Sequence, residues 1–131
     1  MEMKEGDVFE YDYCITEQVY KGFITLFNDN NPLHIDEDFA REKNFSGKVM
    51  HGAIQAGFLS NFIGEKLPVK NVIVQTYKMA FTKPVYCGDK LTLKAIITGV
   101  FESVNCITFK YTFTNCTPIV VSKGEITIGL I

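Results

Sequence analysis

The chain has only two histidines, His34 and His51, and both lie beside residues that could do chemistry with them. His34 ends the hexapeptide Asp29-Asn30-Asn31-Pro32-Leu33-His34. Proline fixes its own φ and disfavours the helical region for the preceding residue, so we expect a turn at Asn31-Pro32. A turn would bring Asp29 beside His34, where a carboxylate orients an imidazole and tunes its proton affinity. This spacing predicts a general acid/base pair.

Two other interpretations of these residues remain open from the sequence. The side chain of Asp29 or Asn30 can close such a turn by itself, with His34 an ordinary loop residue. His34, Asp36 and His51 also offer two imidazoles and a carboxylate, a ligand set known for open metal sites. Their spacing matches no established metal pattern, so we expect neither a metal nor a cofactor.

A second candidate region begins at His51-Gly52, at the head of an apolar segment. The first N–H groups of a helix starting there would be unpaired and would stabilise negative charge. Gly52 would let a ligand approach the backbone closely, whereas Ala56 and Gly57 are interpreted as small residues that allow tight helix packing on a sheet. Small size for packing is also an alternative for Gly52. His51 either shapes the site or is a hydrogen-bonded structural residue.

Hydrophobic patterning predicts the elements that must position these residues. A strand over Val8–Tyr13 and a helix over Thr16–Phe27 precede a long connection, with a turn of helix around Glu37–Glu42. A helix over His51–Lys66 is apolar over most of its circumference and is expected to be buried. Four stretches rich in β-branched and aromatic residues predict strands: Val72–Phe81, Lys90–Val100, Val104–Thr114 and Pro118–Ile128. The predicted class is α+β, with the helix lying across a curved antiparallel sheet.

Composition limits the class of protein further. A length of 131 residues suits a single domain spanning residues 1–131. With 47% hydrophobic and 21% charged residues, the chain favours a buried partner face, most simply in a homodimer. A net charge of −2 argues against nucleic acid as a partner. We expect no membrane association and a cytoplasmic location, since no long apolar run is visible and the four cysteines are scattered without Cys-x-x-Cys spacing.

Several blocks resemble one family over nearly the whole chain. The run from Phe23 to Asp36, with Phe39-Ala40 after it, is similar to the hydratase motif of the MaoC-like, (R)-specific enoyl-CoA hydratases. Gly47-Lys48-Val49-Met50-His51-Gly52 resembles the second block of that family, and the segment 81–89 resembles its Phe-x-x-Pro-Val-x-x-Gly-Asp. Asn28 stands where the family often has glycine before the aspartate. Asparagine tolerates left-handed backbone geometry, so we expect the turn to be kept.

The resemblance implies a hot-dog fold, in which the sheet wraps a long central helix and two subunits join their sheets, as a homodimer or a dimer of dimers. It implies a lyase of fatty acid metabolism, a hydro-lyase that adds water reversibly across the 2,3 double bond of an enoyl thioester. The product would be the (R)-3-hydroxyacyl-CoA, with CoA part of the substrate. Asp29 and His34 would be catalytic, and the Gly52 N–H would bind the thioester oxygen. Asn31 and Pro32 would shape the loop.

Ser60 falls where short-chain members of the family carry a serine that hydrogen-bonds within the active site. It could equally bond back to the helix carbonyl four residues earlier. Neither Ser60 nor Cys87 lies in a recognisable nucleophile turn, so nucleophilic catalysis is not expected.

Three alternative functions remain open. One is an acyl-CoA thioesterase of the same fold, which commonly uses an acidic residue on the central helix; here none occurs before Glu65. The others are a 3-hydroxyacyl-carrier-protein dehydratase and a non-catalytic acyl-thioester binding module. The sequence does not determine the acyl chain length, the pathway, the residues that contact CoA, or which of Asp29 and His34 moves which proton.

Overall fold

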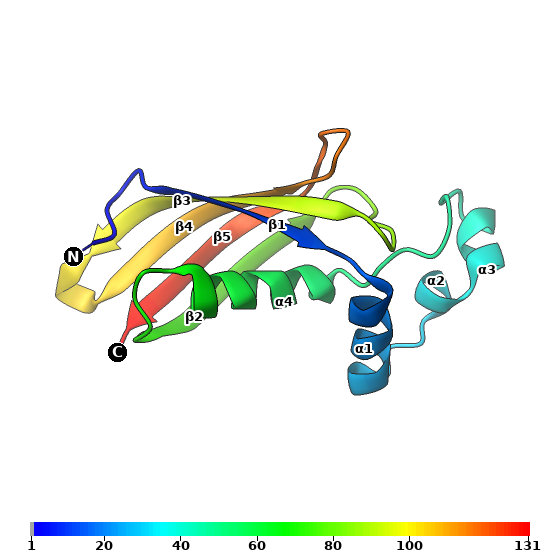
Figure 1. The fold of residues 1–131 in the computed structure, drawn as a ribbon, viewed down its shortest axis with the longest axis horizontal. Helices are drawn as coiled ribbons and strands as arrows, with labels where there is room; N and C mark the ends of the chain where they lie inside the picture. The colour runs from blue at the N-terminus through cyan, green and yellow to red at the C-terminus, as the bar shows by residue number, and fades with distance from the viewer. Residues whose placement is uncertain (1) are drawn as a thin grey trace.

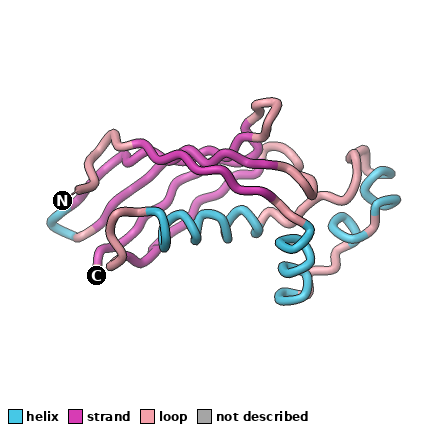
Figure 2. Tube along the Cα trace, viewed as in Figure 1, coloured by secondary structure: helices cyan, strands magenta, loops and turns pink. Residues whose placement is uncertain are grey.

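The computed structural model describes residues 2–131, which form one curved sheet packed against a central helix (Figure 1). The sheet contains β1 (Val8–Cys14), β2 (Val72–Phe81), β3 (Lys90–Phe101), β4 (Cys106–Thr114) and β5 (Val120–Leu130). Its order is β1-β3-β4-β5-β2, and all neighbouring strands are antiparallel. The helix α4 (Ala53–Asn61) lies along the inner face of the curved sheet (Figure 2). The α+β class and the hot-dog arrangement are therefore confirmed.

The core lies between α4 and the inner face of the sheet. Alternate residues of β3 and β4 are buried, as expected for strands with one face on a core. The buried aromatic ring of Phe62 makes edge contacts with Phe9 and Phe109, at centroid separations of 5.6 and 5.9 Å. These contacts hold the C-terminal end of the central helix, where α4 continues into η1, against the sheet.

The central helix differs from its prediction in two ways. The predicted helix over His51–Lys66 is α4 followed by a π-helical turn, η1 (Phe62–Lys66). The face of α4 away from the sheet is exposed at Ala53, Gly57 and Ser60, so the helix is not buried on all sides within one chain. A Cβ added at Gly57 would meet no atom within 4 Å. The interpretation of Gly57 as a packing requirement against the sheet is therefore wrong.

Three short helices form a group beside the N-terminal end of α4 (Figure 1). They are α1 (Glu17–Phe27), α2 (Pro32–Ile35) and α3 (Glu37–Glu42). Thr16 caps α1 by accepting a hydrogen bond from the Val19 N–H at 3.1 Å. The prediction missed α2, because four residues are too few to show a helical period.

Strand boundaries differ by a few residues from those predicted. A 3₁₀ turn, η2 (Glu102–Val104), replaces the predicted start of β4, and β5 begins at Val120 rather than Pro118. Within residues 2–131, no helix has both the length and the apolar character needed to cross a membrane.

Candidate functional site

The site begins at the left-handed residue that ends α1. Asn28 has φ 56° and ψ 33°, and its N–H donates to the Ile24 carbonyl at 2.8 Å. Asparagine adopts this conformation more readily than most residues other than glycine, so the turn is kept despite the departure from the family motif. The reversal places Asp29 immediately beyond the end of α1.

The next turn leads into α2 and places His34 on a helix. Pro32 occupies the first helical position, where its missing N–H costs nothing. Asn31 caps this helix through its side-chain oxygen, which accepts from the Leu33 N–H at 3.0 Å. The Asn31 N–H in turn donates to Oδ1 of Asp29 at 3.2 Å. Asp29 thus closes the turn with one carboxylate oxygen and leaves the other available.

Hydrogen bonding fixes the tautomer of His34. Its Nδ1 lies 2.7 Å from the Val49 carbonyl oxygen, which can only accept, so Nδ1 carries the hydrogen. The Nε2 of the neutral ring then carries a lone pair and can accept a hydrogen bond. This nitrogen lies 3.8 Å from Oδ2 of Asp29. This separation is too long for a direct hydrogen bond and suits two groups that share a water molecule. The structure therefore brings the predicted pair together, with both acceptors available.

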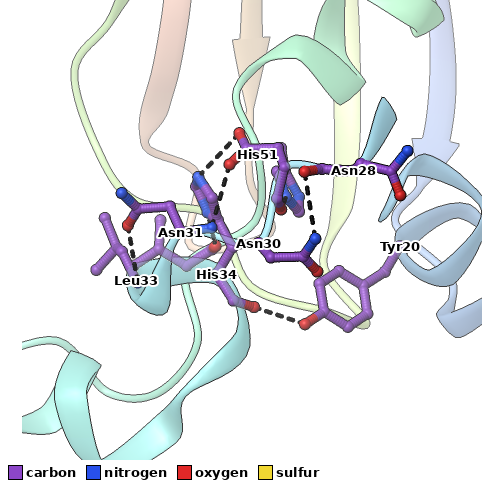
Figure 3. A network of polar contacts seen from close by, with 9 residues as sticks. Tyr20, Asn28, Asn30, Asn31, Leu33, His34 and His51 are labelled. Carbon is purple, nitrogen blue, oxygen red and sulfur yellow. Dashed lines mark hydrogen bonds and ion pairs between the residues drawn. The ribbon is translucent and has the colours of Figure 1, made fainter. Parts of the chain in front are cut away.

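His51 is buried directly behind this pair. Its Nε2–H donates to the Asp29 carbonyl oxygen at 2.9 Å, and its ring stacks on that of His34 with centroids 3.9 Å apart. The Phe23 ring lies 4.6 Å from the His51 ring. Figure 3 shows the two imidazoles together, with the Tyr20 hydroxyl donating to the His34 carbonyl. The arrangement restrains the backbone of Asp29 and the ring of His34 at once.

Gly52 precedes the first residue of α4, at the helix end that faces the pair. Within residues 2–131, no backbone carbonyl or capping side chain accepts from the N–H groups of Gly52 or Ala53. Unpaired donors at a helix N-terminus stabilise negative charge. A Cβ at Gly52 would lie 2.9 Å from the Phe81 ring, so a larger residue would require that exposed ring to move.

Two cavities border the start of α4. One of about 480 Å³ is lined by His34, Gly52 and Phe81, together with Ala53 and Gln55. The other, of about 780 Å³, is lined by Asp29 and by apolar residues of α1 and α4. Asp29 therefore lines one cavity and His34 the other, and Ala53 at the start of α4 lines both.

Ser60 lies apart from this arrangement in the single chain. It is exposed on α4 and lines neither cavity. Among the hydrogen bonds of residues 2–131, its hydroxyl makes none, either within the site or back to the helix. A role for Ser60 in substrate binding stays a prediction.

A group of possible metal ligands is present, but with a different carboxylate from the one considered in the sequence. Asp29, His34 and His51 each offer one ligand atom within 4.8 Å of the others. Asp36 is not among them, because it caps α3 by accepting from the Phe39 N–H at 3.1 Å. Backbone carbonyls already engage His34 Nδ1 and His51 Nε2, so a cation would have only the remaining ring nitrogens and the Asp29 carboxylate.

Cys87 is poorly suited to act as a nucleophile. Burial raises the pKa of the Cys87 thiol, and the hydrogen bond to the neighbouring Glu17 carboxylate raises it further. The thiolate is the nucleophilic form of cysteine, so a raised pKa disfavours attack.

Sequence reasoning missed three residues of the smaller cavity and its surroundings. Gln55 lines the cavity, and the buried Ser122 hydrogen-bonds to it from β5. Phe81 covers Gly52, as described above. A lone glutamine inside an otherwise apolar helix was the available signal for Gln55, since polar groups are rarely buried without a partner.

Comparisons with known proteins show the family of this chain. Residues 2–115 match the family model for the MaoC like domain, and the chain therefore belongs to this family. The (R)-specific enoyl-CoA hydratase of Rhodospirillum rubrum is 32% identical over 127 residues, which cover 97% of this chain and 88% of that protein.

Two further proteins are similar over most of the chain. The mitochondrial 3-hydroxyacyl-[acyl-carrier-protein] dehydratase of Arabidopsis thaliana is 27% identical over 128 residues, covering 95% of this chain and 76% of that protein. The solved (R)-hydratase from A. caviae involved in PHA biosynthesis superimposes with a TM-score of 0.90 at 25% identity, over 99% of this chain and 98% of that one.

Proposed function

We propose that this protein is an (R)-specific enoyl-CoA hydratase, a hydro-lyase that adds water reversibly across the 2,3 double bond of an enoyl thioester. The observation that carries the proposal is the 3.8 Å gap between His34 Nε2 and Asp29 Oδ2, beside the unpaired N–H groups at the start of α4. The relative from R. rubrum and the solved structure from A. caviae carry hydratase names and support it.

The geometry supports a mechanism in which both acceptors hold one water. A water molecule has two O–H groups, and His34 Nε2 and Asp29 Oδ2 can accept one each. The water oxygen forms the new bond to C3 while one of its protons passes to the pair, and C2 receives a proton from the pair. Dehydration of the 3-hydroxyacyl thioester is the same sequence in reverse.

Negative charge builds on the thioester oxygen as water adds to C3. The Gly52 N–H would stabilise this charge, and one well-placed donor contributes roughly 10²–10³-fold to the rate of related reactions. His51 supports the pair by hydrogen-bonding the Asp29 carbonyl and stacking on His34. No metal or other cofactor is needed for these steps.

The test is hydration of crotonyl-CoA, followed as loss of the conjugated enoyl absorbance, with chiral analysis of the 3-hydroxybutyryl-CoA product. We expect turnover and the (R) product. Formation of the (S) product, or no turnover with enoyl thioesters of any chain length, would contradict the proposal.

Each alternative function has an observable consequence. A thioesterase would release free CoA thiol; α4 carries no carboxylate, and Glu65 in η1 is exposed. A carrier-protein dehydratase would prefer the same acyl group on acyl carrier protein over CoA. A binding module would bind enoyl thioesters without product, although the assembled Asp29 and His34 pair favours catalysis.

We also propose a homodimer that acts in the cytoplasm in fatty acid metabolism. The exposed face of α4, and Leu26 and Phe27 at 74% and 68% exposure on α1, leave apolar surface for a second copy to cover. The edge strand β2, with Ile73 and Tyr77 exposed, would pair with its counterpart. Sedimentation equilibrium should give the mass of two chains, and the mass of one chain would contradict the homodimer.

A further inference from the structure

Gln55 is a polar residue in the buried face of the central helix, and the proposed mechanism has not used it. It is 3% exposed, and it lines the cavity that also contains His34 and Gly52. A buried amide without partners would be costly, so its hydrogen bonds need an explanation.

The oxygen of the Gln55 amide accepts a hydrogen bond from the sheet. The Ser122 hydroxyl of β5, itself fully buried, donates to Oε1 of Gln55 at 2.5 Å. The amide oxygen of Gln55 faces Ser122, and its NH₂ group points elsewhere.

The NH₂ group of Gln55 is left to the cavity. Among residues 2–131, no acceptor binds it. In the described residues, His51 Nδ1 is the one fully buried side-chain nitrogen or oxygen without a hydrogen-bond partner. The Gln55 nitrogen has no partner and is not fully buried, so it is accessible from a cavity. Because Gln55 lines the smaller cavity, that cavity is where its two N–H donors are available.

Gln55 and Gly52 occupy the same face of the helix start. Residues three apart are neighbours on a helix surface, and helical side chains lean toward the N-terminus. The leaning places the Gln55 amide toward the turn that begins with Gly52, on the cavity that both residues line.

We propose that the Gln55 amide is a second donor to the thioester carbonyl oxygen, beside the Gly52 N–H, and that Ser122 is the residue that positions it. This inference deepens the proposed hydratase function and rests on it. Two donors would share the charge that develops on the oxygen when water adds to C3. The gain would appear mainly in kcat, since the interaction strengthens as the transition state is approached.

The test uses the double variant Gln55→Leu/Ser122→Ala, which removes both partners of the buried hydrogen bond. Replacing both with apolar groups of similar shape is close to neutral for stability. We expect an unchanged melting temperature, kcat for crotonyl-CoA lower by about a hundredfold, and KM changed by less than about threefold. Gln55→Glu keeps an oxygen for Ser122 and replaces the donor with an acceptor, so its kcat should fall at least as far as that of the double variant. Thr98→Ala/Thr108→Ala, which removes a side-chain hydrogen bond between β3 and β4 outside both cavities, is the matched control and should keep the parent rate.

A second measurement does not depend on turnover. Butyryl-CoA, isotope-labelled at the thioester carbonyl, is bound to each variant, and its carbonyl stretch is recorded by difference infrared spectroscopy. The parent should shift the band to lower frequency than the double variant does, because a hydrogen bond weakens the C=O bond.

The outcomes separate this inference from the proposed function. If the parent hydrates crotonyl-CoA and the double variant keeps both its kcat and the infrared band, Gln55 is only structural and the inference is wrong. If the double variant lost kcat only with substrates that carry a polar acyl group, the inference would also be wrong, since Gln55 would then contact the acyl chain. If the parent is inactive but the band still depends on Gln55, the hydratase proposal fails and the donor assignment stands. Failure of the parent to bind acyl-CoA thioesters of any chain length would overturn both.

Discussion

Replacement of Gly52 by alanine separates stability from catalysis at the start of α4. The added Cβ would lie 2.9, 3.0 and 3.2 Å from three carbons of the Phe81 ring, which must move. That ring is 52% exposed, so it can rotate toward solvent, and the overpacking cost falls near the low end of roughly 1–3 kcal/mol. Gly52 already has helical φ and ψ of −58° and −33°, where Gly→Ala stabilises by about 0.4–1 kcal/mol through the unfolded state. The two effects nearly cancel, so the free energy of unfolding should change by less than about 1 kcal/mol.

The same methyl group should be far more damaging to the reaction. The methyl group would keep the thioester oxygen farther from the N–H of residue 52. A misplacement of about 1 Å at a reacting centre can lower the rate roughly 10²-fold. The assays are urea denaturation for stability and crotonyl-CoA hydration for kcat. Gly64→Ala, in the exposed part of η1 with no atom within 4 Å of the added Cβ, is the control and should keep the parent rate. A Gly52→Ala variant that keeps kcat within about threefold of the parent would refute the reasoning about donors at this helix end.

Three further predictions concern the residues around the pair. Asn28→Ala should cost about 1–2 kcal/mol in urea denaturation because the left-handed conformation disfavours a Cβ, whereas Asn28→Gly should stay within about 0.5 kcal/mol; equal losses would exclude φ strain as the cause. His51→Phe keeps ring stacking but leaves the Asp29 carbonyl without its donor, so it should lose about 1–3 kcal/mol of stability and at least about tenfold in kcat; an unchanged kcat would show that His51 does not order the pair. Dialysis against EDTA should leave kcat unchanged, and a loss restored by added Zn²⁺ would instead assign Asp29, His34 and His51 to a metal.

Local patterns predicted the strands, most of the helices and the α+β class, whereas the hot-dog arrangement came from the family resemblance. Strand and helix positions followed from the spacing of apolar residues, and the turn at Asn28 was expected from the family motif, whose backbone geometry asparagine tolerates. The helix α2 could not be predicted in the same way, because it depends on the Asn31 cap and the fixed φ of Pro32 rather than on periodicity. Its presence determines where the His34 ring points.

The pair Asp29 and His34 could be predicted from sequence, but its tautomer could not. The hydrogen on His34 Nδ1 is fixed by the Val49 carbonyl, a backbone atom whose position depends on how the loop before α4 packs on α2. The partner of Gln55 is equally a tertiary contact, since Ser122 lies 67 positions away in the chain. Such contacts depend on register across the sheet, which local sequence does not encode.

The most direct test of the account compares two carboxylates near the start of α2 and α3. Asp29→Asn keeps an oxygen for the Asn31 N–H but loses the charge that faces His34, and Asp36→Asn keeps the cap of α3. The measurement is kcat for crotonyl-CoA hydration in both variants, with melting temperatures as the control for folding. The account predicts that Asp29→Asn lowers kcat by about 10³-fold, while Asp36→Asn stays close to the parent. Equal rates in the two variants would contradict the assignment of Asp29 and His34 as the water-adding pair.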